Sequence, residues 1–152
     1  MTEMNVTIYY EADHDRLDEL FKSFQQLKRK ESTKAKELFT GFRSGLLRHI
    51  AWEEEILFPH FEQKTGMSHS GPTEVMRMEH RIIKNHLEAI LEKINANNPE
   101  SDEDERLLLQ ILVSHNQKEE RILYPAIDRS LSGGELTKVF TEMEKIRIEQ
   151  VR

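Results

Sequence analysis

One stretch of this sequence decides the fold, and it occurs twice. Residues 49–59 read HIAWEEEILFP, and 66 positions later residues 115–125 read HNQKEERILYP. Both stretches place a glutamate four residues after a histidine. Both then continue through a second glutamate, an Ile-Leu pair and an aromatic residue to a proline. A pattern of this length that recurs at one offset without a gap is typical of an internal duplication.

The same offset joins two shorter segments near the start of each half. Moving 66 positions along the chain takes Asp13 and His14 to Glu79 and His80. Four histidines and two glutamates therefore fall into register across the two halves. Because imidazoles and carboxylates are common metal ligands, side chains kept in register in this way predict a two-fold metal site.

Length and composition indicate one folded domain, residues 1–152, built from two similar halves at about 9–64 and 75–130. A net charge of −6 argues against a nucleic-acid or anionic-membrane partner, since either would need a basic face. No run approaches the roughly 18 apolar residues of a transmembrane helix, and the polar start of the chain does not resemble a signal peptide. We therefore expect a cytoplasmic protein with no nucleic-acid and no membrane partner. The absence of cysteine excludes disulfides and thiolate metal sites.

Apolar residues recur every three to four positions along most of the chain, which predicts an all-α protein made of amphipathic helices. Short polar turns, several with glycine or proline, separate these periodic segments. The expected helices cover approximately residues 5–30, 34–63, 73–96, 102–131 and 135–151. Because the connections are short, the first four should form an antiparallel up-down four-helix bundle. The last is a short C-terminal fifth helix outside the repeat.

Two prolines and two glycines mark points where these helices depart from regularity. Pro59 and Pro125 fall late in the second and fourth helices, where we expect a kink or the last turns, because a proline in a helix interior costs about 3 kcal/mol. Gly41 and Gly45 precede His49 on one helical stripe. We interpret these glycines as positions of close helix packing; a channel toward the metals is the alternative.

The spacing of the repeated residues suits metal binding. In a helix, residues four apart lie on one face, about 5–6 Å apart at Cβ, so His49 and Glu53 can reach one centre. The full predicted ligand set is His14, His49, Glu53, His80, His115 and Glu119. Four imidazoles and two carboxylates suit Fe, Zn, Cu or Mn rather than Ca or Mg. Six ligands are too many for one tetrahedral zinc, but they fit two metals bridged by the carboxylates.

The alternative is a duplicated bundle whose buried histidines only form hydrogen bonds. An isolated His-x-x-x-Glu pair is usually a solvated contact between residues four apart. Two such pairs, each with a further histidine at one common offset, favour the metal site. The alternative also requires two carboxylates to be buried without a metal or basic partners, which is expensive.

These residues, from about 9 to 127, resemble the hemerythrin-like, or HHE cation-binding, domain family. The resemblance implies a four-helix bundle around a non-haem di-iron centre of two Fe ions, with Zn or Mn as substitutes. It also implies roles for the ligands. Glu53 and Glu119 would bridge the irons, His14 and His49 would bind one iron, and His80 and His115 would bind the other.

One position separates this chain from the oxygen carriers of that family, which have a second histidine one turn after the histidine of the third helix. Here that position is Lys84. The ligand set more closely resembles the metal domain of repair-of-iron-centres proteins. This implies a ligand such as O2, NO or peroxide, in oxidative or nitrosative stress or in iron-centre repair. The alternatives are an iron- or oxygen-sensing module, an O2-binding protein without turnover, and a structural bundle filled with zinc.

Four further residues are candidates for a supporting role around the metals. Asp13 and Glu79 each precede a predicted ligand and can support the ligands as hydrogen-bonding partners or act as proton relays, or else lie exposed at the surface. Tyr10, one turn before the first histidine, either touches the site or packs in the core, and we favour packing. Lys84 aligns with Asp18 under the offset, and the two are candidates for an ion pair near the centre.

Overall fold

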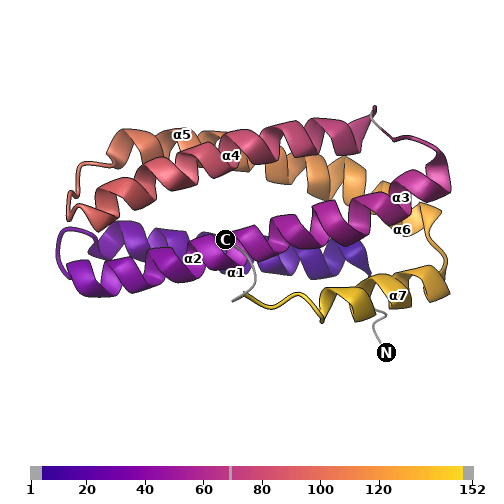
Figure 1. The fold of residues 1–152 in the computed structure, drawn as a ribbon, viewed down its shortest axis with the longest axis horizontal. Coiled ribbons are helices and arrows are strands. Elements are labelled where there is room, and N and C mark those ends of the chain that lie inside the picture. The colour runs from indigo at the N-terminus through magenta and orange to yellow at the C-terminus, as the bar shows by residue number, and fades with distance from the viewer. Residues whose placement is uncertain (1–4, 69, 149–152) are drawn as a thin grey trace.

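The computed structural model describes residues 5–68 and 70–148 and shows an antiparallel bundle of four long helical rods with one additional helix (Figure 1). All regular structure in these residues is helical. The predicted all-α bundle is therefore confirmed. The elements are α1 (Val6–Leu27), α2 (Ser32–Trp52), η1 (Glu53–Leu57), α3 (Phe58–Thr65), α4 (Pro72–Asn95), α5 (Asp102–Lys118), η2 (Glu119–Leu123), α6 (Tyr124–Ser130) and α7 (Gly133–Met143).

Two of the four rods are composite. The second consists of α2, η1 and α3, and the fourth consists of α5, η2 and α6, each without a break between its parts. The first rod, α1, packs along α2, and α4 packs along α5. Among the described residues, no helix is both long and apolar enough to cross a membrane.

The predicted extent of the fifth helix is wrong. It was expected over 135–151, but α7 begins at Gly133, where Ser132 and Glu135 form a capping box, and ends at Met143. Beyond Met143 the backbone leaves the helix, while Ile146 still packs on the same apolar cluster. The positions 149–152 lie outside the described residues.

The elements η1 and η2 are single π-turns, which the sequence analysis did not predict. In each, a backbone N–H bonds to the carbonyl five residues back: Phe58 donates to Glu53, and Tyr124 donates to Glu119. Pro59 and Pro125 follow at once, in the last two turns of their rods. A proline lacks the N–H that the regular ladder needs, so an adjacent π-turn is a reasonable place for it.

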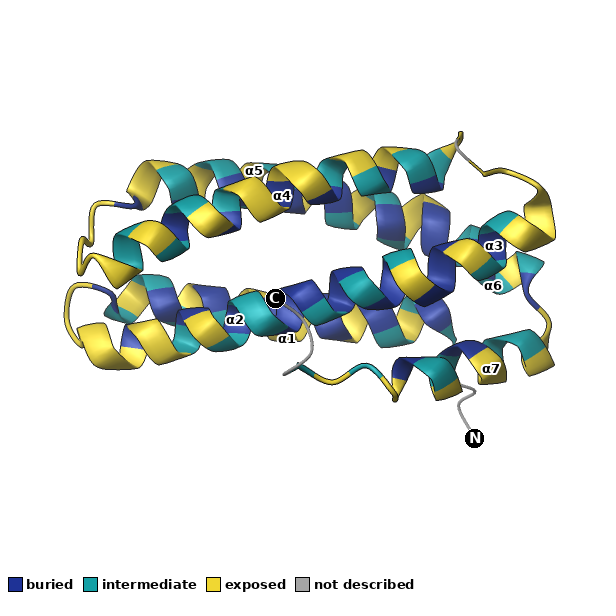
Figure 2. Cartoon of the chain, viewed as in Figure 1, coloured by how far each residue is buried: buried dark blue, intermediate teal, exposed yellow. Residues whose placement is uncertain are grey.

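The core has two apolar clusters with a polar layer between them, and Figure 2 shows the buried residues on the inner faces of the helices. On α1, Tyr10 belongs to one cluster and Leu17 to the other, and His14 lies between them. On α4, Met76 and Ile83 flank His80 in the same way. The layer that contains these histidines is therefore enclosed by one apolar cluster on each side along the bundle.

The start of α1 is held by a residue far away in the sequence. The carboxylate of Asp128, on α6, accepts hydrogen bonds from the backbone N–H of Val6 at 2.8 Å and of Thr7 at 3.0 Å. The Thr7 hydroxyl donates to the same carboxylate at 2.7 Å. An acidic group at a helix N-terminus satisfies free N–H groups and complements the helix dipole. This contact fixes α6 against α1.

The two glycines of α2 differ in their surroundings. A Cβ on Gly45 would lie 2.7 Å from Leu17 Cδ2 and 3.0 Å from a guanidinium nitrogen of Arg16, so α1 packs closely on α2 at this point. A Cβ on Gly41 would meet nothing within 4 Å. The interpretation of close packing therefore applies to Gly45 but not to Gly41.

This difference predicts opposite effects of the same substitution. Gly41→Ala should raise the free energy of unfolding by about 0.5–1 kcal/mol, because alanine favours the helix and has room. Gly45→Ala should lower it by about 1–3 kcal/mol, the usual cost of overpacking. Urea unfolding followed by circular dichroism measures both. If both variants gained stability equally, close packing at Gly45 would be excluded.

Candidate metal centre

The six side chains predicted as ligands meet at the middle of the bundle. They come from six elements, in chain order α1, α2, η1, α4, α5 and η2: His14, His49, Glu53, His80, His115 and Glu119. Each is at most 3% exposed. The fold thus assembles side chains from His14 to Glu119, more than a hundred positions apart in the sequence, into one buried cluster.

The two carboxylates lie between histidines of different halves. Glu53 Oε1 is 3.1 Å from His80 Nε2, and its Oε2 is 3.7 Å from His49 Nε2. Glu119 Oε1 is 3.2 Å from His14 Nε2 and 3.3 Å from His115 Nε2. Each carboxylate therefore faces one histidine from each half, which is the arrangement that a bridging ligand requires.

Several atoms of this cluster lack a hydrogen-bond partner. Glu119 Oε2 is buried without a hydrogen bond, and Glu53 Oε1 and His80 Nε2, although 3.1 Å apart, are not aligned to form one. Leaving such atoms unpaired costs about 1–3 kcal/mol each, and more for charged groups. The donor atoms of the six side chains fall into two groups whose members lie within 4.8 Å of one another, one with Glu53, His80, His115 and Glu119 and one with His14, His49 and Glu119. Donor atoms that converge on two points fit two cations.

Every imidazole of the cluster is oriented by a carboxylate on its outer side. Each Nδ1 lies within hydrogen-bond distance of one acidic side chain, so each Nε2 points inward. The four pairs are His14 with Glu120 at 2.7 Å, His49 with Asp13 at 2.9 Å, His80 with Glu54 at 2.6 Å and His115 with Glu79 at 2.9 Å. The pairs obey the 66-residue offset, because Asp13 corresponds to Glu79 and Glu54 to Glu120.

The sequence indicated only half of this outer layer. Asp13 and Glu79 were candidates, and the structure places each on the histidine of the neighbouring helix rather than on the histidine next to it in sequence. Glu54 and Glu120 were missed as partners. Their signal was present, since both repeated stretches contain two adjacent glutamates.

The other two candidates, Tyr10 and Lys84, lie differently. The Tyr10 ring packs edge-on against His49 with centroids 5.1 Å apart, and its hydroxyl points away, toward Met143 Sδ at 3.2 Å. Lys84 is exposed, and in the described part of the chain it forms no ion pair with Asp18. Burial works against the charge of Glu54, but His80 and then Lys84 lower the pKa of that carboxyl.

A residue that the sequence analysis did not single out reaches the centre. The Tyr124 hydroxyl donates to Glu53 Oε2 at 2.6 Å and lies 2.9 Å from Glu119 Oε1. Burial and these two carboxylates raise the pKa of Tyr124, so it keeps its proton when no cation is present. The equivalent residue in the first half is Phe58, whose ring stacks on His80 with an interplanar angle of 3°.

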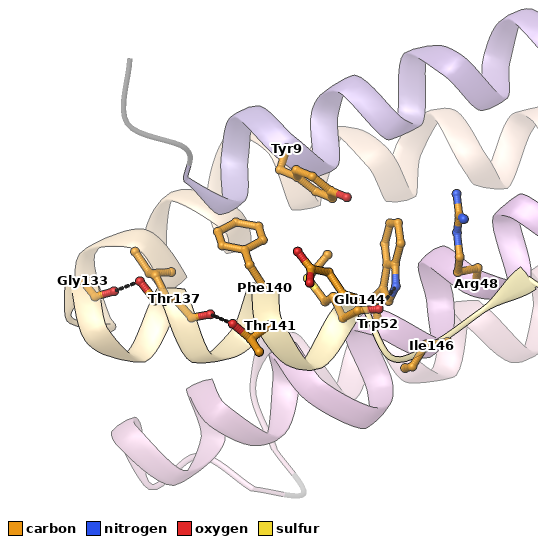
Figure 3. A pocket seen from close by; sticks show the side chains of 11 residues that line it. Tyr9, Arg48, Trp52, Gly133, Thr137, Phe140, Thr141, Glu144 and Ile146 are labelled. Atoms are coloured by element: carbon orange, nitrogen blue, oxygen red, sulfur yellow. Dashed lines mark hydrogen bonds between the residues drawn. The ribbon is translucent and has the colours of Figure 1, made fainter. Parts of the chain in front are cut away.

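A larger cavity lies away from this cluster. It has a volume of about 950 Å³ and lies beside the contact of α7 with α1 and α2, with Tyr9, Trp52 and Phe140 on its walls (Figure 3). Arg48 lies over the Trp52 ring, 4.8 Å from its centroid. The cavity wall contains none of the six clustered side chains. The volume of a cavity alone therefore does not show where the functional site of this protein lies.

In the absence of a cation, protons on the imidazoles balance the buried carboxylates. Burial opposes charge on His49, but Glu53 and Asp13 outweigh it and raise the pKa to about 10. His80 behaves in the same way through Glu53 and Glu54, with a pKa of about 9. Although burial works against it, hydrogen bonds within the cluster, together with His49, lower the pKa of Glu53 well below its usual value. A metal ion must displace these imidazolium protons.

The stability of the protein should therefore depend on pH in opposite ways with and without metal. The unfolded pKa of histidine is about 6.5. In the metal-free protein, the stabilisation from protonated His49 and His80 is complete below that value and is lost as the pH rises through about 9 to 10. In the metal-loaded protein, stability should instead fall toward acid pH, where protons compete with the metal. Melting temperatures of chelated and loaded samples across this range test it, and parallel curves would contradict it.

The outer carboxylates should contribute to metal affinity. Replacing Glu120 by Gln removes the charge that orients His14 and should weaken metal binding about 10–100-fold. Glu54→Gln should act likewise through His80. The matched control is Glu55→Gln, because Glu55 is an exposed neighbour in the same Glu-rich segment. Titration against a competing chelator measures the affinities. Equal affinities for all three variants would show that the outer carboxylates do not support the site.

Comparison with known proteins agrees with this geometry. Residues 7–127 match the family described as the hemerythrin HHE cation binding domain, and the chain belongs to that family. Membership and the buried His/Glu cluster together indicate a metal-binding protein.

One curated relative from Nostoc sp. (strain PCC 7120 / SAG 25.82 / UTEX 2576), described as a DNA nickase, is 30% identical over 150 residues. The match covers 97% of this chain but 41% of the relative, so the chain spans about two fifths of the length of that protein. No solved structure matched this chain.

Proposed function

We propose that this chain is a non-haem di-iron protein whose metal pair binds or reacts with O2, NO or peroxide. Its setting would be oxidative or nitrosative stress or the repair of iron centres, in the cytoplasm. The site of six donors supports two metals, and its mixture of imidazole and carboxylate suits iron, with Zn or Mn as substitutes. The irons would supply redox-active coordination positions for the small ligand.

The observation that carries the proposal is the size and lining of the space at the centre. A cavity of about 10 Å³ touches the six clustered side chains and is otherwise lined mainly by apolar residues, namely Leu46, Ile50, Ile83 and Leu112. The cations would occupy this space, and the apolar wall around it leaves no room for an organic substrate. Only a small ligand could therefore reach the metals.

The surrounding residues would perform three tasks. Glu53 and Glu119 would hold the metals together, and the four histidines would hold them from either side. The outer carboxylates would keep each Nε2 directed inward. The apolar wall would exclude bulk water, which limits side reactions and strengthens the electrostatic interactions inside.

Lys84 favours reaction with oxygen over reversible oxygen carriage. It occupies the position where the oxygen carriers that this chain resembles have another histidine, and its side chain is exposed. Two histidines per metal then leave at least one position for an exogenous ligand on each. We therefore propose a symmetric histidine set with open positions.

The second candidate function is an iron- or oxygen-sensing module. The relative described as a DNA nickase supports it, because there a region similar to this chain forms part of a longer protein. DNA nicking is not part of our proposal. A net charge of −6 does not suit binding to a phosphate backbone, and we propose neither a nucleic-acid nor a membrane partner.

Oxygen cycling tests the proposed function. Protein loaded with iron should hold about two irons per chain. After reduction, addition of O2 should convert it to a stable ferric form, and NO should bind the reduced form. Full recovery of the reduced spectrum under argon over repeated cycles would instead indicate a carrier. A single zinc per chain, or no metal after iron loading, would refute the di-iron assignment.

Two further measurements complete this test. Turnover with peroxide or NO would favour a stress or repair protein, while oxidation that changes the conformation without turnover would favour the sensing module. The variant Lys84→His restores the histidine of an oxygen carrier at an exposed position. If it gained reversible oxygen binding, this single residue would determine which of the two behaviours the centre has.

A further inference from the structure

We propose that Tyr124 is itself a metal ligand, whose hydroxyl oxygen binds the cation held by His14 and His49. This inference rests on the proposed function, because it requires metal at the centre. It concerns a residue outside the repeated His and Glu set. It also makes the two metal positions chemically different.

The position of the hydroxyl oxygen carries the inference. It lies 3.1 Å from His49 Nε2 and 3.4 Å from His14 Nε2. It also lies 2.6 Å from Glu53 Oε2 and 2.9 Å from Glu119 Oε1. Nitrogen and oxygen ligands about 2.1 Å from one metal lie roughly 3 Å from each other when they are adjacent. The phenol oxygen is therefore spaced as one more ligand of the cation that these side chains would share.

The phenol hydroxyl cannot satisfy both carboxylates by itself. It has one proton to donate, and an ionised carboxylate can only accept. Two carboxylate oxygens, one from Glu53 and one from Glu119, lie within 2.9 Å of this single O–H group, so the phenol can donate to only one of them. A cation at this point would bind both carboxylates and the phenol oxygen together.

The π-turn η2 brings Tyr124 to this place. In a regular α-helix, side chains five residues apart point about 140° away from each other. Here the N–H of Tyr124 bonds to the carbonyl of Glu119, and the wider turn places both side chains on one face, 2.9 Å apart. The Tyr10 ring packs against the Tyr124 ring with centroids 5.1 Å apart and holds it in position.

The equivalent π-turn of the first half carries Phe58, which has no hydroxyl. If Glu53 and Glu119 both bridge, the cation between His80 and His115 would have one protein ligand fewer than its neighbour. More open coordination positions would then lie on that side. The exogenous ligand is expected there, beside His80, rather than at the cation bound by Tyr124.

Ligation releases one proton. The phenol O–H bond breaks, both electrons stay on the oxygen, and the proton leaves to solvent. A bound cation would favour the loss of this proton, as it does for other coordinating groups.

Spectroscopy of the iron-loaded protein tests the proposal. In the ferric form, a phenolate ligand gives a visible charge-transfer band and tyrosinate ring modes in the resonance Raman spectrum. Both should be present in the wild type and absent in Tyr124→Phe. The matched control is Tyr10→Phe, since Tyr10 is buried against the same histidine but directs its hydroxyl to Met143. The control should keep both signals.

A second variant tests the proposal even if Tyr124→Phe does not fold. Phe58→Tyr adds a hydroxyl at the equivalent position and should add a second phenolate contribution, roughly doubling the band. A wild type that holds two irons but shows neither signal would overturn the proposal and leave the di-iron function intact. Signals that persist in a folded Tyr124→Phe variant would also overturn it. Failure to bind iron at all would instead refute the proposed function, and the ligand role with it.

Discussion

The structure depends on one electrostatic constraint: two fully buried carboxylates, Glu53 and Glu119, must be neutralised between two apolar cores. Water cannot solvate them there, and isolated buried charges are very costly. In the metal-free protein the compensation comes from His49, His80 and His115, whose pKa values the carboxylates raise although burial works against it. Under the proposed function it would come from the cations that the cluster holds. Either way, the side chains at the middle of the bundle act as a unit, and removing one leaves the others unbalanced.

The same constraint extends outward in alternating layers. Carboxylates at the centre face imidazoles, and each imidazole faces a further carboxylate. Two of these outer carboxylates meet cations near the surface, Asp13 with Arg16 at 3.0 Å and Glu79 with Lys118. Arg16 and Lys118 are not related by the 66-residue offset. The duplication thus keeps the inner layers in register, while the outermost cations come from different helices in the two halves.

The sequence was sufficient for the bundle and for the grouping of the six clustered side chains, because helical periodicity and a repeated spacing are both visible along the chain. It was insufficient where the backbone departs from the regular α-helical period. The π-turns arise from local backbone hydrogen bonds that no residue pattern predicted, although Pro59 and Pro125 lie directly after them. Without those turns, the α-helical period gives no reason to place Tyr124 beside Glu119.

The two halves remain alike at the centre and differ outside it. Ile56 is 6% exposed beneath α7, whereas its equivalent Ile122 is 63% exposed, because no second helix covers that face within the described residues. At the centre the difference is smaller: the second half has Tyr124 where the first half has Phe58. The Tyr124 oxygen lies among the donor atoms of a buried site, 2.6 Å from Glu53 Oε2 and 3.1 Å from His49 Nε2. Each added donor there would change how a cation is held.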